Sequence, residues 1–230
     1  MREIVWDTET TGFDPEGGDR LVEIGAIELQ NHMPTGKIFH QYINPERDMP
    51  AGAFEVHGLS EEFLKDYPVF KDVGQAFIDF VGDAVLIAHN ASFDMKFINA
   101  ELKWAELPQF PNNRALDTLE IARRKFPGAQ NSLDALCRRF GVDNSGREKH
   151  GALLDSELLA EVYLELIGGR QPDLTLDVVA GRDVEVKQNA QEKAAARKVP
   201  LASKLTEEER TAHEEFVSAF GADAAWKTYH

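Results

Sequence analysis

The sequence predicts an α/β domain with a mixed β-sheet flanked by helices, followed by a flexible linker and a short C-terminal tail. Three observations predict it. Strand-like segments come first, at 2–7, 21–29 and 37–45. A short apolar segment at 84–89 then alternates with helical segments, and large apolar residues become scarce after residue 169. Strands followed by mixed strands and helices are typical of a layered α/β domain.

The expected strands are rich in β-branched and aromatic residues and are bounded by Gly, Pro or Asn. The loop 13–20 joins the first two, and the short connections favour an antiparallel meander over the first three strands. The segment 84–89, AVLIAH, is apolar over most of its length, which indicates a short buried strand.

Four segments have apolar residues at helical spacing, and we expect helices there: 70–82, 92–105, 132–141 and 151–169. In the third, Ser132 is a capping residue and Gly141 a stop signal. The folded domain is therefore expected to occupy residues 1–169.

Composition limits the possible functions. The chain has 230 residues, 43% of them hydrophobic, and a net charge of −15. No apolar run approaches the ~20 residues of a membrane span, no secretory leader is recognisable, and Cys137 is the only cysteine. We expect a cytoplasmic protein with no membrane partner, no internal disulfide and no cysteine-based zinc site. So acidic a chain would not hold nucleic acid by bulk charge, although bound metal ions can invert the local field.

Acidic residues stand where an isolated charge is costly. Asp7 and Glu9 share one face of the first strand, because strand side chains alternate. Asp94 lies between aromatic and aliphatic neighbours, and Asp155 lies among leucines. Such carboxylates need a partner, and an all-oxygen set suits Mg²⁺ or Mn²⁺. Two such ions could clamp a phosphate for displacement, with His150 taking a proton from water.

Each of these residues also has an ordinary explanation. Asp7 and Glu9 could be a solvent-facing pair at a strand end, and Asp94 a first-turn acid favoured by the helix dipole. Asp155 and His150 could face water. For each residue taken by itself, the ordinary explanation is favoured. The order and spacing of the whole set reverse that balance.

The set of motifs DTET (7–10), HNASFD (89–94) and HGALLD (150–155) resembles the three motifs of the DEDDh 3′–5′ exonucleases. The segments 54–70 and 126–164 further resemble the epsilon proofreading subunits of bacterial DNA polymerase III. The resemblance covers about residues 2–169. It implies a ribonuclease H-like fold and removal of 3′-terminal nucleotides as 5′-monophosphates, preferentially from mismatched DNA ends.

The resemblance also implies the roles of individual residues. Two divalent ions, Mg²⁺ or Mn²⁺, would be bound by four carboxylates: Asp7, Glu9, Asp94 and Asp155. His150 would be the general base. Six further residues would contact the terminal nucleotide: Thr8, Thr11, Gly12, His57, His89 and Asn90. Phe13 could stack on a base or be a core residue of its loop. Phe93 could support the terminal bases, but packing in the core is the favoured explanation. His89 and Asn90 could be purely structural.

The remaining chain carries the expected partner contacts. Residues 170–176 fit the Q-x-x-L-x-L pattern of sliding-clamp ligands through three residues: Gln171, Leu174 and Leu176. Residues 177–200 read as a flexible linker. The tail 201–230 opens with a capping box at Thr206 and Glu209. It carries the apolar residues Phe216, Phe220 and Trp226, which would bind the polymerase alpha subunit.

The partner contacts have alternatives too. The tail could fold back on the first domain, and the Q-x-x-L-x-L pattern could be a chance feature of the linker. The resemblance admits a small theta-like subunit as a third partner. The leading hypothesis is a proofreading exonuclease at the bacterial replisome. A stand-alone DEDDh nuclease that trims RNA or short oligonucleotides, and a purely structural polymerase subunit, are the alternatives.

Overall fold

The computed structural model describes residues 1–146, 149–169 and 206–218. The chain divides into two units, Met1–Thr175 and Leu176–His230, which are described separately. The predicted clamp-binding segment 170–176 and the predicted linker 177–200 lie outside the described residues. So do five of the predicted partner contacts: Gln171, Leu174, Leu176, Phe220 and Trp226.

The first unit is built on a five-stranded mixed sheet with the order β3-β2-β1-β4-β5. Its strands are β1 Arg2–Thr10, β2 Leu21–Gln30, β3 Met33–Tyr42, β4 Val85–Ala88 and β5 Ala115–Asp117. The first three form the predicted antiparallel meander. β4 is parallel to β1, and β5 is parallel to β4. The mixed sheet is confirmed, but β3 begins four residues before the predicted segment, and β5 was not predicted.

Seven α-helices of this unit surround the sheet: α1 Ala51–His57, α2 Glu61–Leu64, α3 Phe70–Val81, α4 Ala91–Trp104, α5 Thr118–Lys125, α6 Leu133–Phe140 and α7 Ala152–Leu166. Two 3-10 turns, η1 Pro15–Gly17 and η2 Asn112–Arg114, lie in the connections. The four predicted helices correspond to α3, α4, α6 and α7. As predicted, the Ser132 side chain caps α6, and Gly141 ends it with a positive φ.

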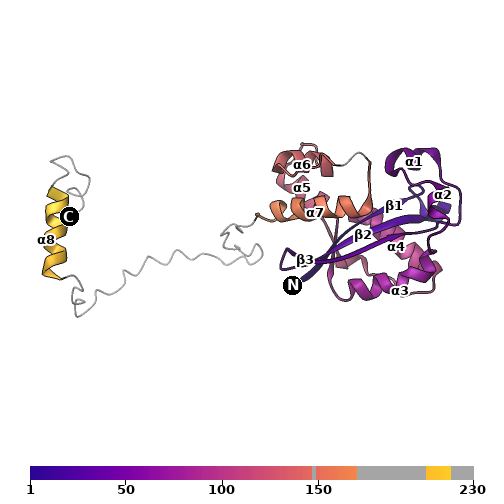
Figure 1. Ribbon diagram of the computed structural model, residues 1–230, viewed down its shortest axis with the longest axis horizontal. Helices are drawn as coiled ribbons and strands as arrows, with labels where there is room; N and C mark the ends of the chain where they lie inside the picture. Colours follow the sequence, from indigo (N-terminus) through magenta and orange to yellow (C-terminus); the bar gives the residue numbers. More distant parts are fainter. Residues whose placement is uncertain (147–148, 170–205, 219–230) are drawn as a thin grey trace, which may run out of the picture. The chain divides into compact units, whose positions relative to one another are not determined.

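The helices form a layer on each face of the sheet (Figure 1). Even-numbered residues of β1, such as Ile4 and Trp6, join the core under α3 and α4. Val5, from the odd-numbered set, packs with Leu159 and Tyr163 of α7. Helices α5 and α6 pack on α7 through a third cluster that contains the buried Cys137. The strand alternation of β1 therefore decides which layer each residue meets.

Gly25 of β2 allows α7 to dock directly on the sheet. A Cβ at this position would lie 2.2 Å from the backbone nitrogen of Leu153 and 2.3 Å from the carbonyl carbon of Ala152. The Ser156 hydroxyl donates a hydrogen bond of 2.9 Å to the Gly25 carbonyl. Gly25 is also the ladder partner of Asp7. The first turns of α7 are thereby held beside the end of β1.

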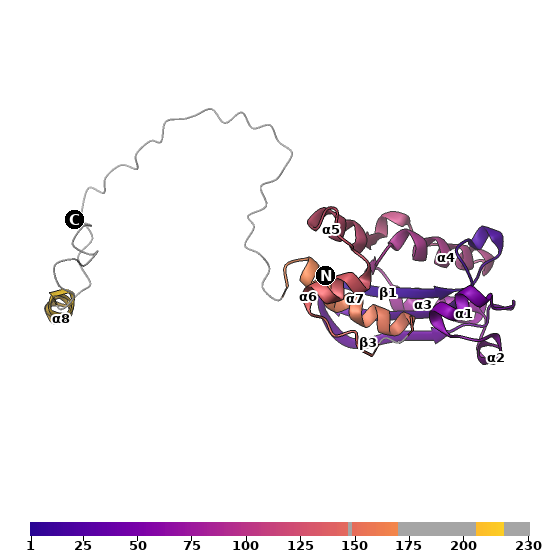
Figure 2. The same cartoon turned by 90° about the horizontal axis from the view of Figure 1, so that it is seen from above.

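The C-terminal ends of β1 and β4 lie at the end of the sheet away from the N-terminus, where Figure 2 also shows α1. The backbone N–H of His150 donates to the carbonyl of Val56 in α1, at 3.3 Å. This contact ties the segment before α7 to the same end of the sheet. In open α/β sheets, ligands bind beyond the carboxyl ends of the strands.

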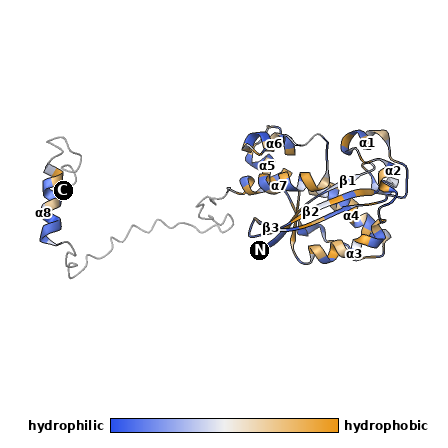
Figure 3. Ribbon diagram, viewed as in Figure 1, coloured by the Kyte–Doolittle hydropathy of each residue, from blue (hydrophilic) through white to orange (hydrophobic). Residues whose placement is uncertain are grey.

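The second unit contains the helix α8, Glu207–Ser218. The predicted capping box is present, because the Thr206 hydroxyl accepts from the N–H of Glu209 at 3.2 Å and the Thr206 N–H donates to the Glu209 carboxylate at 2.8 Å. The helix is mostly hydrophilic (Figure 3), and Phe216 is 64% exposed. Across the described segments, no helix combines the length and apolar character needed to span a membrane.

Candidate active site

A cavity of about 280 Å³ opens at the C-terminal end of β1. It brings together side chains from β1, α4, α6 and α7 and from the segments that precede these helices. The lining residues are Asp7, Thr8, Glu9, His89, Phe93, Asp94, Ser132, Leu133, Asp134, His150 and Asp155. All five residues predicted to be catalytic therefore meet in one place.

The β1 contribution follows from the strand geometry. Asp7 and Glu9 lie on the face of the sheet that meets α7, as the alternation predicts. Glu9 is 7% exposed and pairs across the ladder with Glu23, which is itself buried. The strand holds the two acids on one face, so their negative charges repel each other within the site.

Asp94 reaches the cavity from α4, on the other side of the sheet. The helix begins at Ala91, shortly after β4, and the preceding Asn90, with a φ of 72°, turns the chain from strand to helix. Asp94 is 2% exposed and accepts a hydrogen bond of 2.7 Å from the Thr8 hydroxyl. Burial raises the pKa of Asp94 to about 7, although the Thr8 hydroxyl opposes the shift. The charged form is costly here unless a cation accompanies it.

The α7 contribution is Asp155 with His150, which lies just before the helix. Asp155 is 3% exposed, whereas the His150 side chain is 48% exposed. The Nδ1 atom of His150 is 3.3 Å from a carboxylate oxygen of Asp155. A Glu23 oxygen accepts from the N–H of Ala152 at 3.1 Å and so secures the start of the helix. The histidine is thus beside an acid and about half exposed to solvent.

The donor atoms suit divalent cations. Five carboxylates and two histidines line the cavity, and its described lining includes no Lys or Arg. One ligand atom each from Glu9, His150 and Asp155 lies within 4.8 Å of the other two. Carboxylate oxygens are the preferred ligands of Mg²⁺ and Mn²⁺. A site with this charge, largely out of water, fits one or more such ions.

The comparison with known proteins now decides the family. The family model described as Exonuclease matches residues 4–163. The DNA polymerase III subunit epsilon of Rickettsia felis is 51% identical over 224 residues, covering 95% of this chain and 96% of the relative. The corresponding subunit of Escherichia coli (strain K12) is 41% identical over 241 residues, covering 98% and 97%. The chain belongs to the exonuclease family, among the DNA polymerase III epsilon subunits.

Solved structures agree with this fold. Exonuclease X in complex with 5′ overhanging duplex DNA matches the exonuclease chain at a TM-score of 0.54 and 25% identity, covering 72% of this chain and 90% of that one. The nuclease domain of 3′hExo, a DEDDh family member, matches at 0.63 and 21%, covering 72% and 91%. The predicted ribonuclease H-like exonuclease fold and the predicted 3′–5′ exonuclease class are confirmed.

The predicted substrate contacts divide into two groups. Thr8 and His89 line the cavity of the exonuclease. His89 is held on both ring nitrogens, at 2.9 Å from the Thr118 hydroxyl and 2.8 Å from the Asn131 carbonyl. Burial lowers the pKa of His89. These local bonds give His89 the structural role considered above, and its contact with substrate stays a prediction.

The other predicted contacts do not line the cavity. Thr11 is 1% exposed, and its hydroxyl accepts from the N–H of Arg20 at 3.0 Å. A Cβ at Gly12 would lie 2.3 Å from the carboxylate of Asp19. Asn90 is exposed at the start of α4. For Thr11 and Gly12, the loop after β1 curls toward Asp19, which the sequence pattern alone does not indicate.

His57 lies at the end of α1, beside the segment that carries His150. It is 6% exposed, and its Nδ1 accepts from the N–H of Leu59 at 3.0 Å. The proton is therefore on Nε2, which has no hydrogen-bond partner within the described residues. Burial lowers the pKa of His57. A buried N–H donor is thus left over near the site.

Phe13 is 85% exposed, so it is not a core residue of its loop. Its ring stands 6.4 Å from that of Phe93, which in turn packs at 4.9 Å against Phe97. Phe93 lines the cavity and anchors this aromatic row in the core. Stacking of a base on the exposed Phe13 stays a prediction.

Asp134 was missed by the sequence analysis. It lies in the first turn of α6, lines the cavity and accepts a hydrogen bond of 3.1 Å from the Asn144 amide. In the sequence it reads as an ordinary first-turn acid after the cap Ser132. No spacing links it to the other acids, since only the packing of α6 on α7 brings it there.

Proposed function

We propose that this exonuclease proofreads DNA replication: it removes mismatched 3′-terminal nucleotides as 5′-monophosphates by hydrolysis with two divalent ions. The observation that carries the proposal is the carboxylate cavity at the end of β1, whose described lining has no Lys or Arg. Such a cavity repels a phosphate by itself. It becomes a phosphate site only when cations fill it.

The residues of the cavity have different roles in the proposed hydrolysis. Asp7, Glu9, Asp94 and Asp155 would hold the ions, which when bound supply a nucleophilic water and stabilise the leaving oxygen. His150 would accept the proton of that water, with Asp155 orienting its ring from 3.3 Å. Thr8 fixes Asp94 through its 2.7 Å hydrogen bond. The spare N–H of His57 would donate to an oxygen of the terminal nucleotide.

Specificity for mismatches follows from the size of the site. A cavity of about 280 Å³ has room for one nucleotide end and not for a duplex. A paired terminus must therefore separate before it enters, and the cost of a few kcal/mol is smaller for a mismatch. Proofreading then needs no reading of the base sequence.

The test is excision from a primer–template with a single 3′ mismatch in the presence of Mg²⁺. The wild-type chain should shorten this primer faster than a fully paired one and release 5′-monophosphates. Asp7→Ala should be inactive on both, and Asp66→Asn, which changes an exposed acid of the same unit, should match the wild type. EDTA should stop the reaction, and added Mg²⁺ or Mn²⁺ should restore it.

The outcomes separate the hypotheses. Equal rates on paired and mismatched ends, with faster trimming of RNA, would support the stand-alone nuclease. Wild-type inactivity with normal binding to the polymerase would support the structural subunit. Activity that survives Asp7→Ala would remove the role given to the carboxylate cavity.

We further propose that the chain acts in the bacterial cytoplasm, within the DNA polymerase III core. The names of the relatives at 51% and 41% identity support this. The tail would bind the alpha subunit through Phe216, Phe220 and Trp226, of which Phe216 is described and 64% exposed. Gln171, Leu174 and Leu176 would bind the sliding clamp. A theta-like subunit is a third candidate partner.

Deletion of residues 177–230 tests the tail. The shortened chain should lose binding to the alpha subunit and keep its activity on free single strands. Phe216→Ala in the full chain should weaken the same binding, with Thr211→Ala on the same helix as a control. Undiminished binding of the shortened chain would contradict the assignment.

A further inference from the structure

A second pocket adjoins the carboxylate cavity and has the opposite character. Its volume is about 550 Å³, and we call it the Arg123 pocket. Its lining residues are His89, Leu119, Arg123, Gly128, Ala129, Asn131 and Ser132. His89 and Ser132 also line the carboxylate cavity, so the two spaces share a wall.

The charges of the two spaces are complementary along the wall they share. The carboxylate cavity is lined by five acids with no Lys or Arg, whereas the Arg123 pocket is lined by one arginine and no acid. In the part of the chain that the structure describes, no carboxylate lies within ion-pair distance of the Arg123 guanidinium. Arg123 is exposed, so its charge is available to a ligand.

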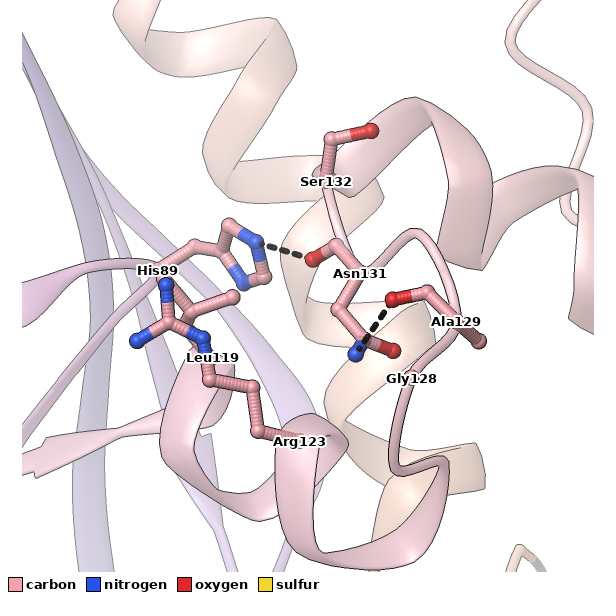
Figure 4. Close-up of a pocket in the computed structure, with 7 residues that line it drawn as sticks. All are labelled: His89, Leu119, Arg123, Gly128, Ala129, Asn131 and Ser132. Atoms are coloured by element: carbon pink, nitrogen blue, oxygen red, sulfur yellow. Dashed lines mark hydrogen bonds between the residues drawn. The ribbon is translucent and has the colours of Figure 1, made fainter.

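The walls of the Arg123 pocket are fixed before any ligand arrives. Figure 4 shows His89 pointing to the loop that carries Asn131 and Ser132, whereas the Arg123 side chain extends from α5 away from this loop. His89 binds the Asn131 carbonyl at 2.8 Å, and the Asn131 amide donates to the Ala129 carbonyl at 3.1 Å. The Arg139 guanidinium stacks on Phe126 at 4.3 Å and braces the loop from outside.

Gly128 allows the turn of the loop, because its φ of 76° is one that side chains rarely adopt. The space is large enough for more than a single ion. The hydroxyl of Ser132 and the carbonyl-bound His89 add polar groups where the two spaces meet. The pocket is therefore suited to an extended anionic ligand that continues into the cavity.

We propose that the Arg123 pocket is a subsite for a backbone phosphate of the single strand, upstream of the phosphate that is cleaved. The inference rests on the proposed function, because it places the terminal nucleotide in the carboxylate cavity. The next phosphate of the strand must lie outside that cavity, and the only described arginine that lines either space is Arg123. Arginine is well suited to phosphate, which it can bind with two parallel hydrogen bonds.

The test compares two substrates of the full-length chain with Mg²⁺. The p-nitrophenyl ester of thymidine 5′-monophosphate has the scissile phosphate and no upstream phosphate. A single-stranded hexanucleotide has both. For Arg123→Gln, the KM should rise about tenfold more on the hexanucleotide than on the ester, as expected for one charge-assisted bond. The slope of log KM against log salt should fall by about 0.7.

Arg124→Gln is the matched control, because it removes the same charge from the next residue, which does not line the pocket. It should behave as the wild type on both substrates. Arg123→Lys should recover part of the hexanucleotide KM. Thermal unfolding of all variants should coincide, since Arg123 is exposed.

A hexanucleotide KM for Arg123→Gln equal to that of Arg124→Gln would overturn the inference and leave the proposed function standing. An equal loss on both substrates would also overturn it, because the effect would then not depend on the upstream phosphate. A wild-type chain inactive on both substrates would overturn the proposed function itself.

Discussion

The two ends of the central sheet both bury acidic side chains, but they satisfy them differently. At the start of β1, Glu28 is 4% exposed and pairs with Arg2 and, at 3.1 Å, with Lys37. Glu3 is fully buried and accepts from the Tyr163 hydroxyl at 2.8 Å, with His32 at 2.9 Å. At the end of β1, five acids share a cavity whose described lining has no Lys or Arg.

The difference separates structural acids from functional ones. A buried carboxylate with cations and donors from its own chain completes a structure. A group of buried carboxylates whose described lining has no Lys or Arg keeps a mutual repulsion, which a bound cation relieves. Burial alone would not have told the two ends apart.

The largest effect is expected for Asp155→Asn, at the repulsive end. Excision with Mg²⁺ should fall by about a thousandfold, the upper range for the loss of one electrostatic group at a reacting centre. In EDTA the same variant should unfold at a temperature about 2–4 °C higher, because one of the crowded charges is gone. Excision rates measure the expected loss of activity, and thermal unfolding in EDTA measures the expected gain in stability.

Asp66→Asn is the control for this prediction, because Asp66 is exposed. It should change neither quantity. A variant that is inactive and also less stable in EDTA would mean that Asp155 is a structural acid like Glu28, and the contrast between the two ends would fail.

Gly25→Ala should have the next largest effect, because it disturbs the docking that builds the repulsive end. The new Cβ would lie 2.2 Å from the backbone of α7, so the helix must shift. We expect a loss of about 3 kcal/mol in the free energy of unfolding and a lower excision rate. Urea unfolding and primer excision measure the two effects.

Gly52→Ala provides the comparison for Gly25→Ala. Gly52 lies in α1 with no atom within 4 Å of its would-be Cβ, so alanine should be neutral or slightly stabilising. If Gly25→Ala were as mild, the first turns of α7 would not be fixed by β2, and the position of Asp155 would need another explanation.

The sequence predicted mainly the longer elements of this molecule, in which the apolar pattern repeats several times. The helices α3, α4, α6 and α7 repeat their apolar residues over at least two turns, and the meander strands are eight residues or longer. By contrast, β5 spans three residues, Ala115–Asp117, too few to show any period. The helix α2 has a single turn and was missed for the same reason.

The site was predictable to the extent that it lies in motifs. The resemblance placed five residues, and the structure gathers them in one cavity. Asp134 of α6 and Arg123 of α5 belong to no such motif, and the packing of these two helices on α7 brings them to the site. The resemblance also implied substrate contacts for Thr11 and Gly12; these residues contact Arg20 and Asp19, and their contact with substrate stays a prediction.

At the satisfied end, acid should reveal the pairing of Glu28. Its hydrogen bonds with Arg2, then with Lys37 and Thr35, lower the pKa of Glu28 to about 2. A depressed pKa in the folded state means that the stabilisation is complete above the unfolded-state value of about 4.3 and is lost as the pH falls toward 2. Glu28→Gln should therefore cost about 1–2 kcal/mol at pH 7 and progressively less below pH 4.

Urea unfolding at pH 7, 4 and 3 measures this difference, with Glu61→Gln, at an exposed acid, as the control. Excision at pH 7 should be unchanged in both variants. A difference that grows as the solution is acidified would have the wrong sign, and the carboxylate would then not be stabilised by its pairs.

The smallest effect is expected for Tyr163→Phe, because Glu3 keeps two other contacts, the ring of His32 at 2.9 Å and the His32 N–H at 3.0 Å. Burial, followed by the bond to Glu3, raises the pKa of Tyr163, so the hydroxyl remains a donor. Loss of the Tyr163 hydroxyl should cost about 1 kcal/mol in the free energy of unfolding and leave excision unchanged.

Tyr67→Phe is the control for the loss of a hydroxyl. Among the described aromatic residues, the Tyr67 ring packs only against Tyr42 and Phe63. If Tyr163→Phe reduced excision without reducing stability, the two ends of β1 would be coupled, and an acid satisfied by its own chain could no longer be taken as purely structural.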